Sequence, residues 1–372
     1  MKFMGIWPEE RGWKQRSSYL VLVPIFFMLC FVCIPQTANI PNIRHNLYLL
    51  VDNFSMANLT VFLSFFKTVT FWMRGTSLKS LLKYMAIDWS VRTRPNDRVI
   101  MMNVAKFSRR TILVSTMCCN LLVGAYVVKH RITAKYTDRK LFFHAIFPYD
   151  VSTNPNLELT IFGQLVAGMY SAGTYTAVDT FIVMLVLHVC GQLAILKQDM
   201  LNLQEHQGAQ LQAALADIVQ RHEYINRFAR TIENCFTMML LVQMLGCTMQ
   251  LCFQAFQAIM TLSGEEKELM LVQTIFLFLY LLYIMAQLYL YCYVGEKLAT
   301  ESAGIATTAF NCGWHKLPSK KAKLLVIIMC RGKSPLRITA GKFCSFTLEL
   351  YSEILKRSMG YISVLYAMKN KP

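Results

Sequence analysis

Residues 164–196 read QLVAGMYSAGTYTAVDTFIVMLVLHVCGQLAIL and form the longest predominantly apolar stretch of the chain. Asp179 and His188 are its only acidic or basic side chains. A helix needs ~20 apolar residues to cross the ~30 Å hydrocarbon core of a bilayer. This stretch therefore predicts a membrane-spanning helix, Gln164–Leu196, that is longer than one crossing requires.

Six further apolar runs lie on either side of it, so the sequence predicts an all-α polytopic membrane protein with seven transmembrane helices. The first run follows Lys14 and Arg16, as a secretory signal would, but no convincing cleavage motif comes after it, and we expect a retained span. The run Ala322–Cys330 is too short to cross and predicts a buried helix outside the bilayer. The six other spans are Tyr19–Pro35, Phe54–Met73, Thr111–Val128, Asn234–Met260, Leu269–Val294 and Phe343–Ala367.

The composition favours a membrane protein over a soluble or disordered one. Hydrophobic residues make up 55% of the 372 residues and charged residues 16%, and the mean hydropathy is +0.38. Soluble domains carry roughly 25% charged residues. The formal charge of +17 would suggest a nucleic-acid partner in a soluble protein. The positions of the cations give a different explanation.

Lysine and arginine alternate between rich and poor connections. Of 38 such residues, 25 lie in residues 1–18, 74–110, 197–233 and 295–341, whereas only 9 lie in the opposite set of connections and the tail. Because cytoplasmic loops carry the cationic excess, the amino terminus is predicted in the cytoplasm and the carboxyl terminus outside. This orientation is the inverse of a G-protein-coupled receptor, and it explains the charge with no nucleic acid.

No catalytic or metal-binding pattern stands out. Gly332-Lys333-Ser334 resembles the end of a phosphate loop, but Ile327 occupies the place of its first glycine. The 12 cysteines lie mostly in apolar runs, where cysteine behaves as a small hydrophobe. We therefore predict no enzyme activity, no metal, no cofactor and no disulfide framework.

Ionisable residues at membrane depth usually face protein or water. Asp179 and His188 lie nine residues apart, which places them on different faces of one helix. We expect interhelical hydrogen bonds that fix packing, with ligand contact or gating as the alternative. Lys67, near the inner end of its span, is expected to snorkel to the interface without a functional role.

The seventh span carries a polar stripe along one face. Glu349, Glu353, Lys356, Gly360 and Val364 follow one another in steps of four, three, four and four residues. Such a helix can line water below an apolar constriction formed by residues 360–368. The alternative is a Glu353–Arg357 pair buried among helices, and composition does not decide between them.

The connections suggest how the chain is organised. Residues 197–233 keep helical spacing and predict helix extensions in the cytoplasm, where with residues 295–342 they would form an assembly region. Residues 1–196 and 234–294 would form the ligand-binding helical domain, and 343–372 the pore-lining helix and tail. The outer connection His130–Phe162 could cover an extracellular cavity, and Asn53-Phe-Ser is a candidate glycosylation site at the outer edge.

The carboxyl-terminal third resembles the insect odorant receptor family. The resemblance covers the topology of the whole chain but, as sequence motifs, only about residues 290–368. Its ordered elements are Tyr291-Cys-Tyr-Val-Gly-Glu-Lys-Leu298, Glu301-Ser302, Phe310-Asn-Cys-Gly-Trp314, Thr339-Ala-Gly-Lys342, Ser345-Phe-Thr-Leu-Glu349 and the helix Tyr351–Met368.

The resemblance implies a subunit of a heterotetrameric, ligand-gated, non-selective cation channel in the plasma membrane of sensory-neuron dendrites. Its partners would be co-receptor subunits, a volatile odorant, lipid and permeant cations. The short connection 197–233 resembles a tuning subunit and not the co-receptor. Val364 would form the gate, flanked by Leu365, Ser363 and Gly360, and Glu349, Glu353 and Lys356 would line the pore or inner vestibule.

The family also implies an odorant site in the outer half of the membrane. The chemistry there predicts a small, apolar and possibly aromatic ligand, because rings are many and charges few. The alternative role of each residue is helix packing. The candidates are Phe54, Asn58, Phe62, Asn120, Gly124, Tyr126, Tyr170, Thr174, Tyr175, Thr274, Leu277 and Tyr280.

Three other functions stay open at this point. A metabotropic seven-helix receptor would place the amino terminus outside. A gustatory-type receptor of the same superfamily would form channels without a co-receptor. A secondary transporter would show internal repeats and paired broken helices, which this sequence lacks.

Overall fold

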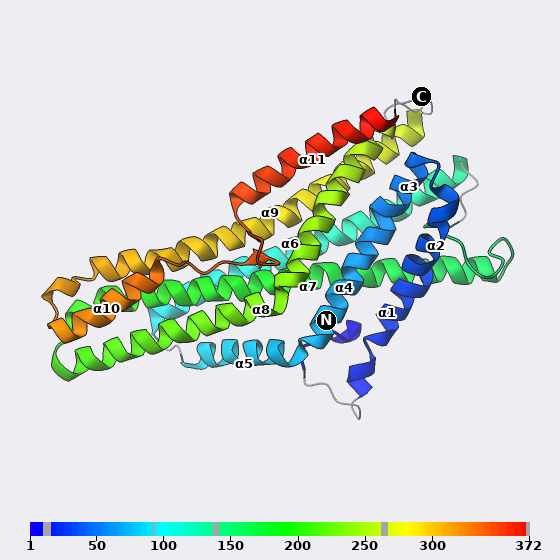
Figure 1. The fold of residues 1–372 in the computed structure, drawn as a ribbon. Helices are drawn as coiled ribbons and strands as arrows, with labels where there is room; N and C mark the ends of the chain where they lie inside the picture. The colour runs from blue at the N-terminus through cyan, green and yellow to red at the C-terminus, as the bar shows by residue number, and fades with distance from the viewer. Residues whose placement is uncertain (10–15, 92–93, 137–140, 262–266, 370–372) are drawn as a thin grey trace.

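The computed structural model describes residues 1–9, 16–91, 94–136, 141–261 and 267–369. The described chain is almost entirely helical, in agreement with the predicted all-α fold (Figure 1). The α-helices are α1 (Leu22–Met28), α2 (Ile34–Ile43), α3 (Leu47–Asn53), α4 (Leu59–Met73), α5 (Gly75–Val91), α6 (Pro95–Tyr136), α7 (Asn156–Leu201), α8 (Gly208–Thr261), α9 (Lys267–Asn311), α10 (Ser319–Gly332) and α11 (Leu348–Lys369).

Every predicted span overlaps one of these helices. By length and composition, five described helical segments could cross a membrane: Leu22–Ile43, α6, α7, α8 and α9. Leu59–Met73 is a shorter apolar helix. The predicted first span ended too early, because the helix continues through Pro35 to Ile43. A π-helical turn, η3 (Leu29–Cys33), comes just before that proline, and such widened turns accommodate local irregularity in a helix.

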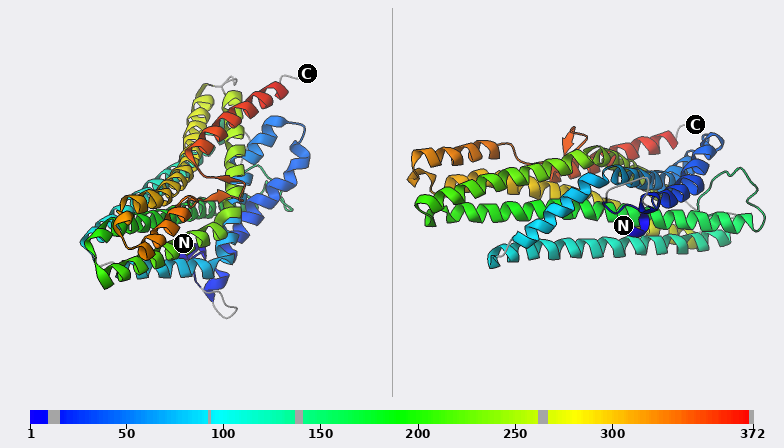
Figure 2. Two further views of the ribbon diagram at one scale, coloured as in Figure 1. Left: turned by 60° about the vertical axis from the view of Figure 1, so that its left-hand side comes forward. Right: turned by 90° about the horizontal axis from the view of Figure 1, so that it is seen from below.

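Helix α7 occupies the centre of the bundle and α6 lies at its edge. In the most apolar part of α7, 89% of the residues are buried, whereas most residues of α6 are exposed or half-buried in the single chain. Two views show α6 alongside α7 with its far side uncovered (Figure 2). The exposed apolar side of α6 is the surface that lipid covers in a membrane protein.

The bundle has two unlike ends. At one, here called the loop end, residues 141–155 join α6 to α7. At the other, the extension end, α7, α8 and α9 run well past the helices near the amino terminus and meet α10 (Figure 1). The helical extensions predicted for residues 197–233 are confirmed, since α7 continues to Leu201 and α8 begins at Gly208. At this end, the Asp199 carboxylate on α7 forms ion pairs with Arg94 at 2.7 Å and with Arg221 at 2.8 Å.

Helix α10 is longer and less buried than the predicted run Ala322–Cys330. It packs on α9 through one stripe, in which Leu325, Ile328 and Gly332 are buried. Ile327 on another side is 64% exposed in the single chain. The expectation of a buried helix is therefore right for one face only.

The predicted start of the seventh span at Phe343 is wrong. Strands β1 (Thr339–Ala340) and β2 (Cys344–Ser345) form an antiparallel hairpin there, and α11 begins only at Leu348. Gly341 and Lys342 in the turn both have positive φ, as tight hairpin turns require. The hairpin is held on α8, because the Gly341 N–H donates to the Thr237 carbonyl at 2.8 Å and the Thr339 N–H to Glu233 at 3.0 Å.

The approach to α11 also depends on a glycine in α9. A Cβ added to Gly295 would lie 2.3 Å from the Phe346 carbonyl oxygen, a backbone atom that cannot rotate away. We expect Gly295→Ala to lower the free energy of unfolding by about 1–3 kcal/mol, as overpacking does. Gly124→Ala is the control, because nothing lies within 4 Å of its added Cβ. Equal melting temperatures for the two purified variants would contradict this packing.

Candidate functional site

An apolar cavity of about 140 Å³ lies among α4, α6, α7, α8 and α9. Its walls are mostly aliphatic and aromatic, and the polar groups are hydroxyls and amides without charge, as in typical small-molecule sites. The lining residues are Thr60, Val61, Cys119, Leu122, Val123, Tyr126, Val127, Phe142, Phe143, Gln164, Leu165, Gly168, Met169, Ser171, Ala172, Tyr175, Gln250, Phe276, Tyr280, Tyr283 and Ile284.

One wall of this apolar cavity carries a triangle of polar side chains from three helices. Thr60 Oγ1 on α4 lies 2.8 Å from the Tyr280 hydroxyl on α9. Gln250 on α8 donates from Nε2 to Thr60 Oγ1 at 2.8 Å and to the Tyr280 hydroxyl at 3.3 Å. The Gln250 Oε1 atom is buried and has no hydrogen-bond partner. The cavity therefore has one defined polar corner.

A buried ion pair adjoins the cavity at Tyr175. Lys67 Nζ lies 3.3 Å from the centroid of the Tyr175 ring and 2.6 Å from an Asp179 oxygen. The side chains of Lys67 and Asp179 are 1% and 0% exposed. The expectation that Lys67 snorkels is thus wrong, because a carboxylate on α7 gives its ammonium group a partner inside the protein.

Asp179 connects this ion pair to α9. The Tyr291 hydroxyl donates to Asp179 Oδ1 at 2.5 Å, and Gln287 Nε2 donates to Oδ2. The Tyr291 ring in turn lies 5.7 Å from that of Phe346, two residues before α11. A continuous series of contacts therefore runs from the cavity wall to the start of α11.

His188 makes a separate interhelical contact, as its position on another face predicts. Its Nε2 lies 2.7 Å from Asp88 Oδ2 on α5, and both side chains are largely buried. The expected packing role of Asp179 and His188 is confirmed in geometry, since each joins α7 to other helices.

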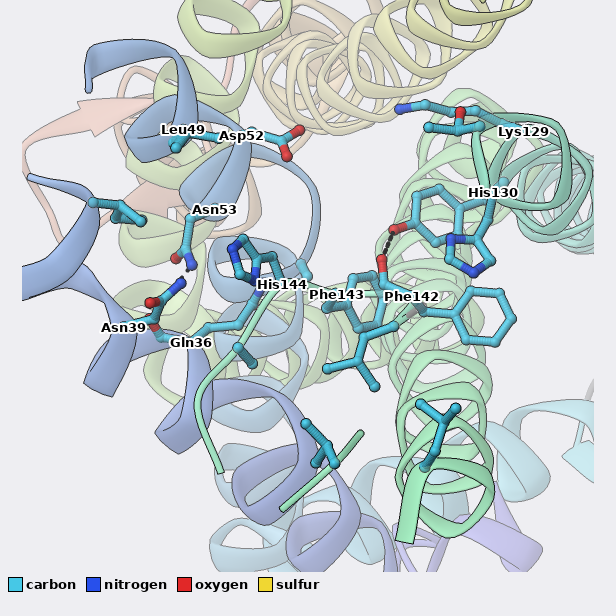
Figure 3. A pocket seen from close by; sticks show the side chains of 18 of the residues that line it. Gln36, Asn39, Leu49, Asp52, Asn53, Lys129, His130, Phe142, Phe143 and His144 are labelled. Atoms are coloured by element: carbon cyan, nitrogen blue, oxygen red, sulfur yellow. Dashed lines mark hydrogen bonds between the residues drawn. The ribbon is translucent and has the colours of Figure 1, made fainter. Parts of the chain in front are cut away.

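A second, larger cavity of about 660 Å³ lies at the loop end (Figure 3). Tyr126, Phe142 and Phe143 line both cavities and form the wall between them. The rest of the lining of this larger cavity mixes aliphatic side chains, such as Ile43 and Leu49, with polar ones, such as Gln36, Asp52 and Lys129. The expectation that the connection 130–162 covers a cavity agrees with this arrangement.

The charge of this loop-end cavity is mixed. Hydrogen bonds from the Ser152 hydroxyl and N–H lower the pKa of the Asp150 carboxyl. Asp150 therefore stays ionised at neutral pH, in a lining that also holds Lys129 and Asp52. These charged groups give the loop-end cavity a polar side beside its aliphatic one.

Three of the twelve candidate ligand residues line the apolar cavity: Tyr126, Tyr175 and Tyr280. Phe62, Asn120 and Gly124 are exposed on the bundle surface, and the Asn120 amide donates to the Thr116 carbonyl of its own helix. The other six contact neighbouring helices or a different pocket.

Two of these six make polar contacts: Asn58 donates to Thr37, and Thr174 contacts Met4. Two pack against rings, Tyr170 near Phe27 and Phe54 near Phe253. Leu277 lines a separate small pocket, and Thr274 Oγ1 is buried without a partner among the described residues.

The sequence interpretation missed the buried amides of α8. Gln243, Gln250 and Gln257 are all buried and recur every seven residues, a spacing that places them on one helix face. This repeat of glutamines within an apolar span could have predicted a polar face of α8 that packs against other helices of the protein. Phe142 and Phe143 could not be found in this way, because they lie in an irregular connection.

The glycosylation candidate Asn53 is not accessible in the folded chain. Its side chain is 5% exposed, and Nδ2 donates to the Gln36 carbonyl at 3.4 Å. A glycan needs a solvent-facing amide nitrogen, so the folded structure argues against modification there.

Helix α11 lies at the edge of the bundle against α8 and α9. Ile354 and Ser358 are buried in that contact, whereas Glu349, Glu353, Lys356 and Gly360 are exposed. Glu353 and Arg357 pair at 3.1 Å with 48% and 71% of their side chains exposed, so the alternative of a buried pair does not hold for the single chain. Ser363 Oγ bonds within the helix to the Met359 carbonyl. Val364 and Leu365 lie on α11, but their side chains fall outside the described part of the structure.

The long apolar helices and the apolar cavity among them define a polytopic helical membrane protein with a pocket of small-molecule size. The sequence profile described as 7tm Odorant receptor matches residues 46–359, and the chain belongs to that family of receptors.

Similarity to individual relatives extends over nearly the whole chain. Odorant receptor 13a of Drosophila melanogaster is 24% identical over 98% of this chain and 93% of its own length. The odorant receptor coreceptor of Aedes aegypti is 29% identical, but over only 45% of this chain and 34% of its own. The similarity thus extends over nearly the whole length of odorant receptor 13a, but over only about a third of the coreceptor.

The fold is also that of a solved insect receptor. The olfactory receptor OR5 of Machilis hrabei in complex with eugenol superposes with a TM-score of 0.83, covering 99% of this chain and 95% of that one at 16% identity. A second structure of the same receptor gives a TM-score of 0.80, covering 98% of this chain and 94% of that one at 17% identity.

Proposed function

We propose that this protein is the odorant-binding subunit of a ligand-gated, non-selective cation channel, assembled as a heterotetramer with co-receptor subunits. The observation that carries the proposal is the apolar cavity, which is lined by five helices and connected by contacts to the start of α11. Membership of the odorant receptor family supports it.

The ligand is a small, mostly apolar molecule, and an aromatic ring fits the cavity well. An engineered protein cavity of about 150 Å³ holds one benzene molecule. The present cavity of about 140 Å³ is similar, so a single ring with a short substituent is the expected size. Tyr126, Tyr280 and Phe276 supply ring faces and edges for aromatic contact.

The basic connections orient the chain with the extension end in the cytoplasm and the loop end outside, in the plasma membrane of a sensory neuron. In that orientation both cavities lie toward the outer surface. The extension end supplies the contacts between subunits. The loop-end cavity then offers a route from the outer surface toward the apolar one.

Helix α11 is the pore-lining element. Its charged stripe cannot face lipid at acceptable cost, and the neighbouring helices of the same chain do not cover it. Around a central axis, Glu349, Glu353 and Lys356 contact water in the inner part of the pore. Val364 forms the constriction, with Leu365, Ser363 and Gly360 beside it.

Ligand binding shifts a closed–open equilibrium toward the open form to the extent that the ligand prefers that form. Tyr175, Lys67, Asp179 and Tyr291 lie between the cavity and the segment before α11. These side chains are buried, so they cannot exchange one another for water. A change in the packing of Tyr175 therefore displaces its buried neighbours and, through them, the segment before α11.

The proposal is tested by expressing the chain with and without a co-receptor and recording whole-cell current during application of small aromatic volatiles. We expect ligand-evoked cation current only from the pair. Evoked current from this chain alone would indicate the gustatory-type mode instead. An epitope tag at the amino terminus that is stained in intact cells would contradict the orientation.

A further inference from the structure

Helix α7 contains four glycines, and close packing explains three of them. A Cβ added at Gly163, Gly173 or Gly191 would lie 2.2, 2.4 or 3.2 Å, respectively, from a side chain of another segment. A Cβ added at Gly168 would have no heavy atom within 4 Å among the described residues outside its own stretch of helix. Helix packing therefore does not require a glycine at position 168.

The backbone does not require a glycine at this position either. Gly168 lies well inside α7, in ordinary right-handed helix, so an alanine would fit the local conformation. A glycine in the interior of a helix lowers stability relative to alanine, because it loses more conformational freedom on folding. The reason for this glycine must therefore be sought in the space beside it.

Gly168 belongs to an inward-facing row of α7. Gln164, Gly168, Ser171 and Tyr175 follow one another in steps of four, three and four residues, which places them on one helix face, and all four line the apolar cavity. Gln164, Ser171 and Tyr175 are 0%, 3% and 5% exposed, whereas Gly168 between them is half-buried. The open space beside Gly168 is therefore a hollow in this row, and it belongs to the cavity.

Hydrogen bonds hold the row on both sides of the hollow. The Gln164 amide donates to the Phe143 carbonyl at 2.9 Å and accepts from the Phe143 N–H at 3.1 Å. One turn after Gly168, the Ser171 hydroxyl donates to the Ser64 hydroxyl on α4 at 2.8 Å. These bonds keep both side chains directed at their partners, so that neither fills the space at position 168.

We infer that Gly168 is a specificity-determining residue of the apolar cavity, and that the missing side chain sets the largest ligand that fits. This inference rests on the proposed function and specifies the size of its ligand. The whole cavity has a volume of only about 140 Å³, so a side chain at position 168 would occupy space that a larger ligand needs. A difference of one methylene in an apolar pocket changes binding by roughly 10–200-fold.

Toluene and propylbenzene test the inference, because they share one ring and differ by two methylenes. Each is added to the purified complex of this chain with its co-receptor, and the apparent affinity is read from ligand-dependent thermal stabilisation. We expect Gly168→Ala to weaken propylbenzene relative to toluene by about tenfold, and Gly168→Val to weaken it further. Both variants should still bind toluene.

The stability of the complex without ligand gives a second readout. Gly168→Ala should raise the melting temperature by about 1–2 °C, because the helix gains a better helix former and the added methyl group meets no neighbour. A fall of several degrees would show that position 168 is already packed, and would overturn the inference.

Gly124→Ala and Gly124→Val on α6 are the matched controls. A Cβ added at Gly124 also has no neighbour within 4 Å among the described residues, but Gly124 is exposed and does not line the apolar cavity. These controls should keep the wild-type ratio of propylbenzene to toluene affinity.

The outcomes distinguish the inference from the proposed function. A wild-type affinity ratio in both Gly168 variants, or an equal change in the Gly124 variants, would overturn the inference and leave the cavity as the ligand site. Stabilisation of the wild-type complex by neither probe would overturn both. The alanine variant keeps the test decisive if the bulkier valine prevents folding.

Discussion

Lys67→Met is expected to destabilise the protein by about 3–5 kcal/mol, because it leaves the buried Asp179 carboxylate without its cation. Asp179 is 0% exposed and retains the neutral Tyr291 and Gln287 donors, which do not balance its charge. Asp179→Leu should cost a similar amount, since Lys67 then lacks its anion. The measurement is the melting temperature of purified protein, together with the amount delivered to the cell surface.

The double variant Lys67→Met/Asp179→Leu should recover part of that loss, because it leaves no unpaired buried charge, although the buried Tyr291 and Gln287 donors lose their acceptor. Arg227→Met is the control. Its pair with Glu223 spans 3.1 Å, with the Arg227 and Glu223 side chains 75% and 47% exposed, so little stability depends on it. Single variants as stable as wild type, or a double variant no better than either, would contradict the account of this pair.

The same series separates stability from signalling. If the pair connects the cavity to α11, the double variant should reach the surface yet respond to ligand with a smaller maximal current. The reason is that Tyr291 loses its carboxylate acceptor and no longer holds a defined position beside Phe346. A full-sized response from the double variant would limit the pair to a structural role.

Val364→Ser is expected to raise the current measured without ligand by something on the order of tenfold, because a hydroxyl in a narrow apolar ring lowers the cost of wetting it by ~1–2 kcal/mol. Val364→Ala should act in the same direction by widening the ring. Both effects are read as leak current in cells that express the chain with a co-receptor.

The control for Val364 is a valine-to-serine change outside the proposed pore. Val23 on α1 is 43% exposed in the single chain and lies on a helix that does not belong to the pore in this account. Val23→Ser should leave the leak current unchanged. Normal leak, ion permeability and block in Val364→Ser would remove Val364 from the gate.

The helices were predictable from the sequence, because a bilayer core demands long apolar runs wherever they occur. The start of α11 was not, since Phe343 and the residues directly after it, such as Cys344 and Phe346, are apolar enough to read as helix. The hairpin of β1 and β2 depends instead on Gly341 and on the Glu233 and Thr237 acceptors of α8. Such long-range partners leave no local pattern.

The ligand residues were predictable only in kind. Spacing along a helix shows which residues share a face, but not which face turns toward the cavity, and so Phe62 and Asn120 were placed on the wrong side. The error at Lys67 has the same origin. Its partner Asp179 lies 112 residues away, and no property of the α4 sequence reveals that the two meet.

The central claim is that α11 lines a shared pore that ligand binding at the apolar cavity controls. A structure of the chain assembled with its co-receptor, solved with a small aromatic ligand, tests it most directly. The account predicts ligand density in the apolar cavity beside Tyr126 and Tyr280, and α11 on the symmetry axis with Glu349, Glu353 and Lys356 turned inward. An assembly in which α11 faces lipid, away from any axis, would contradict it.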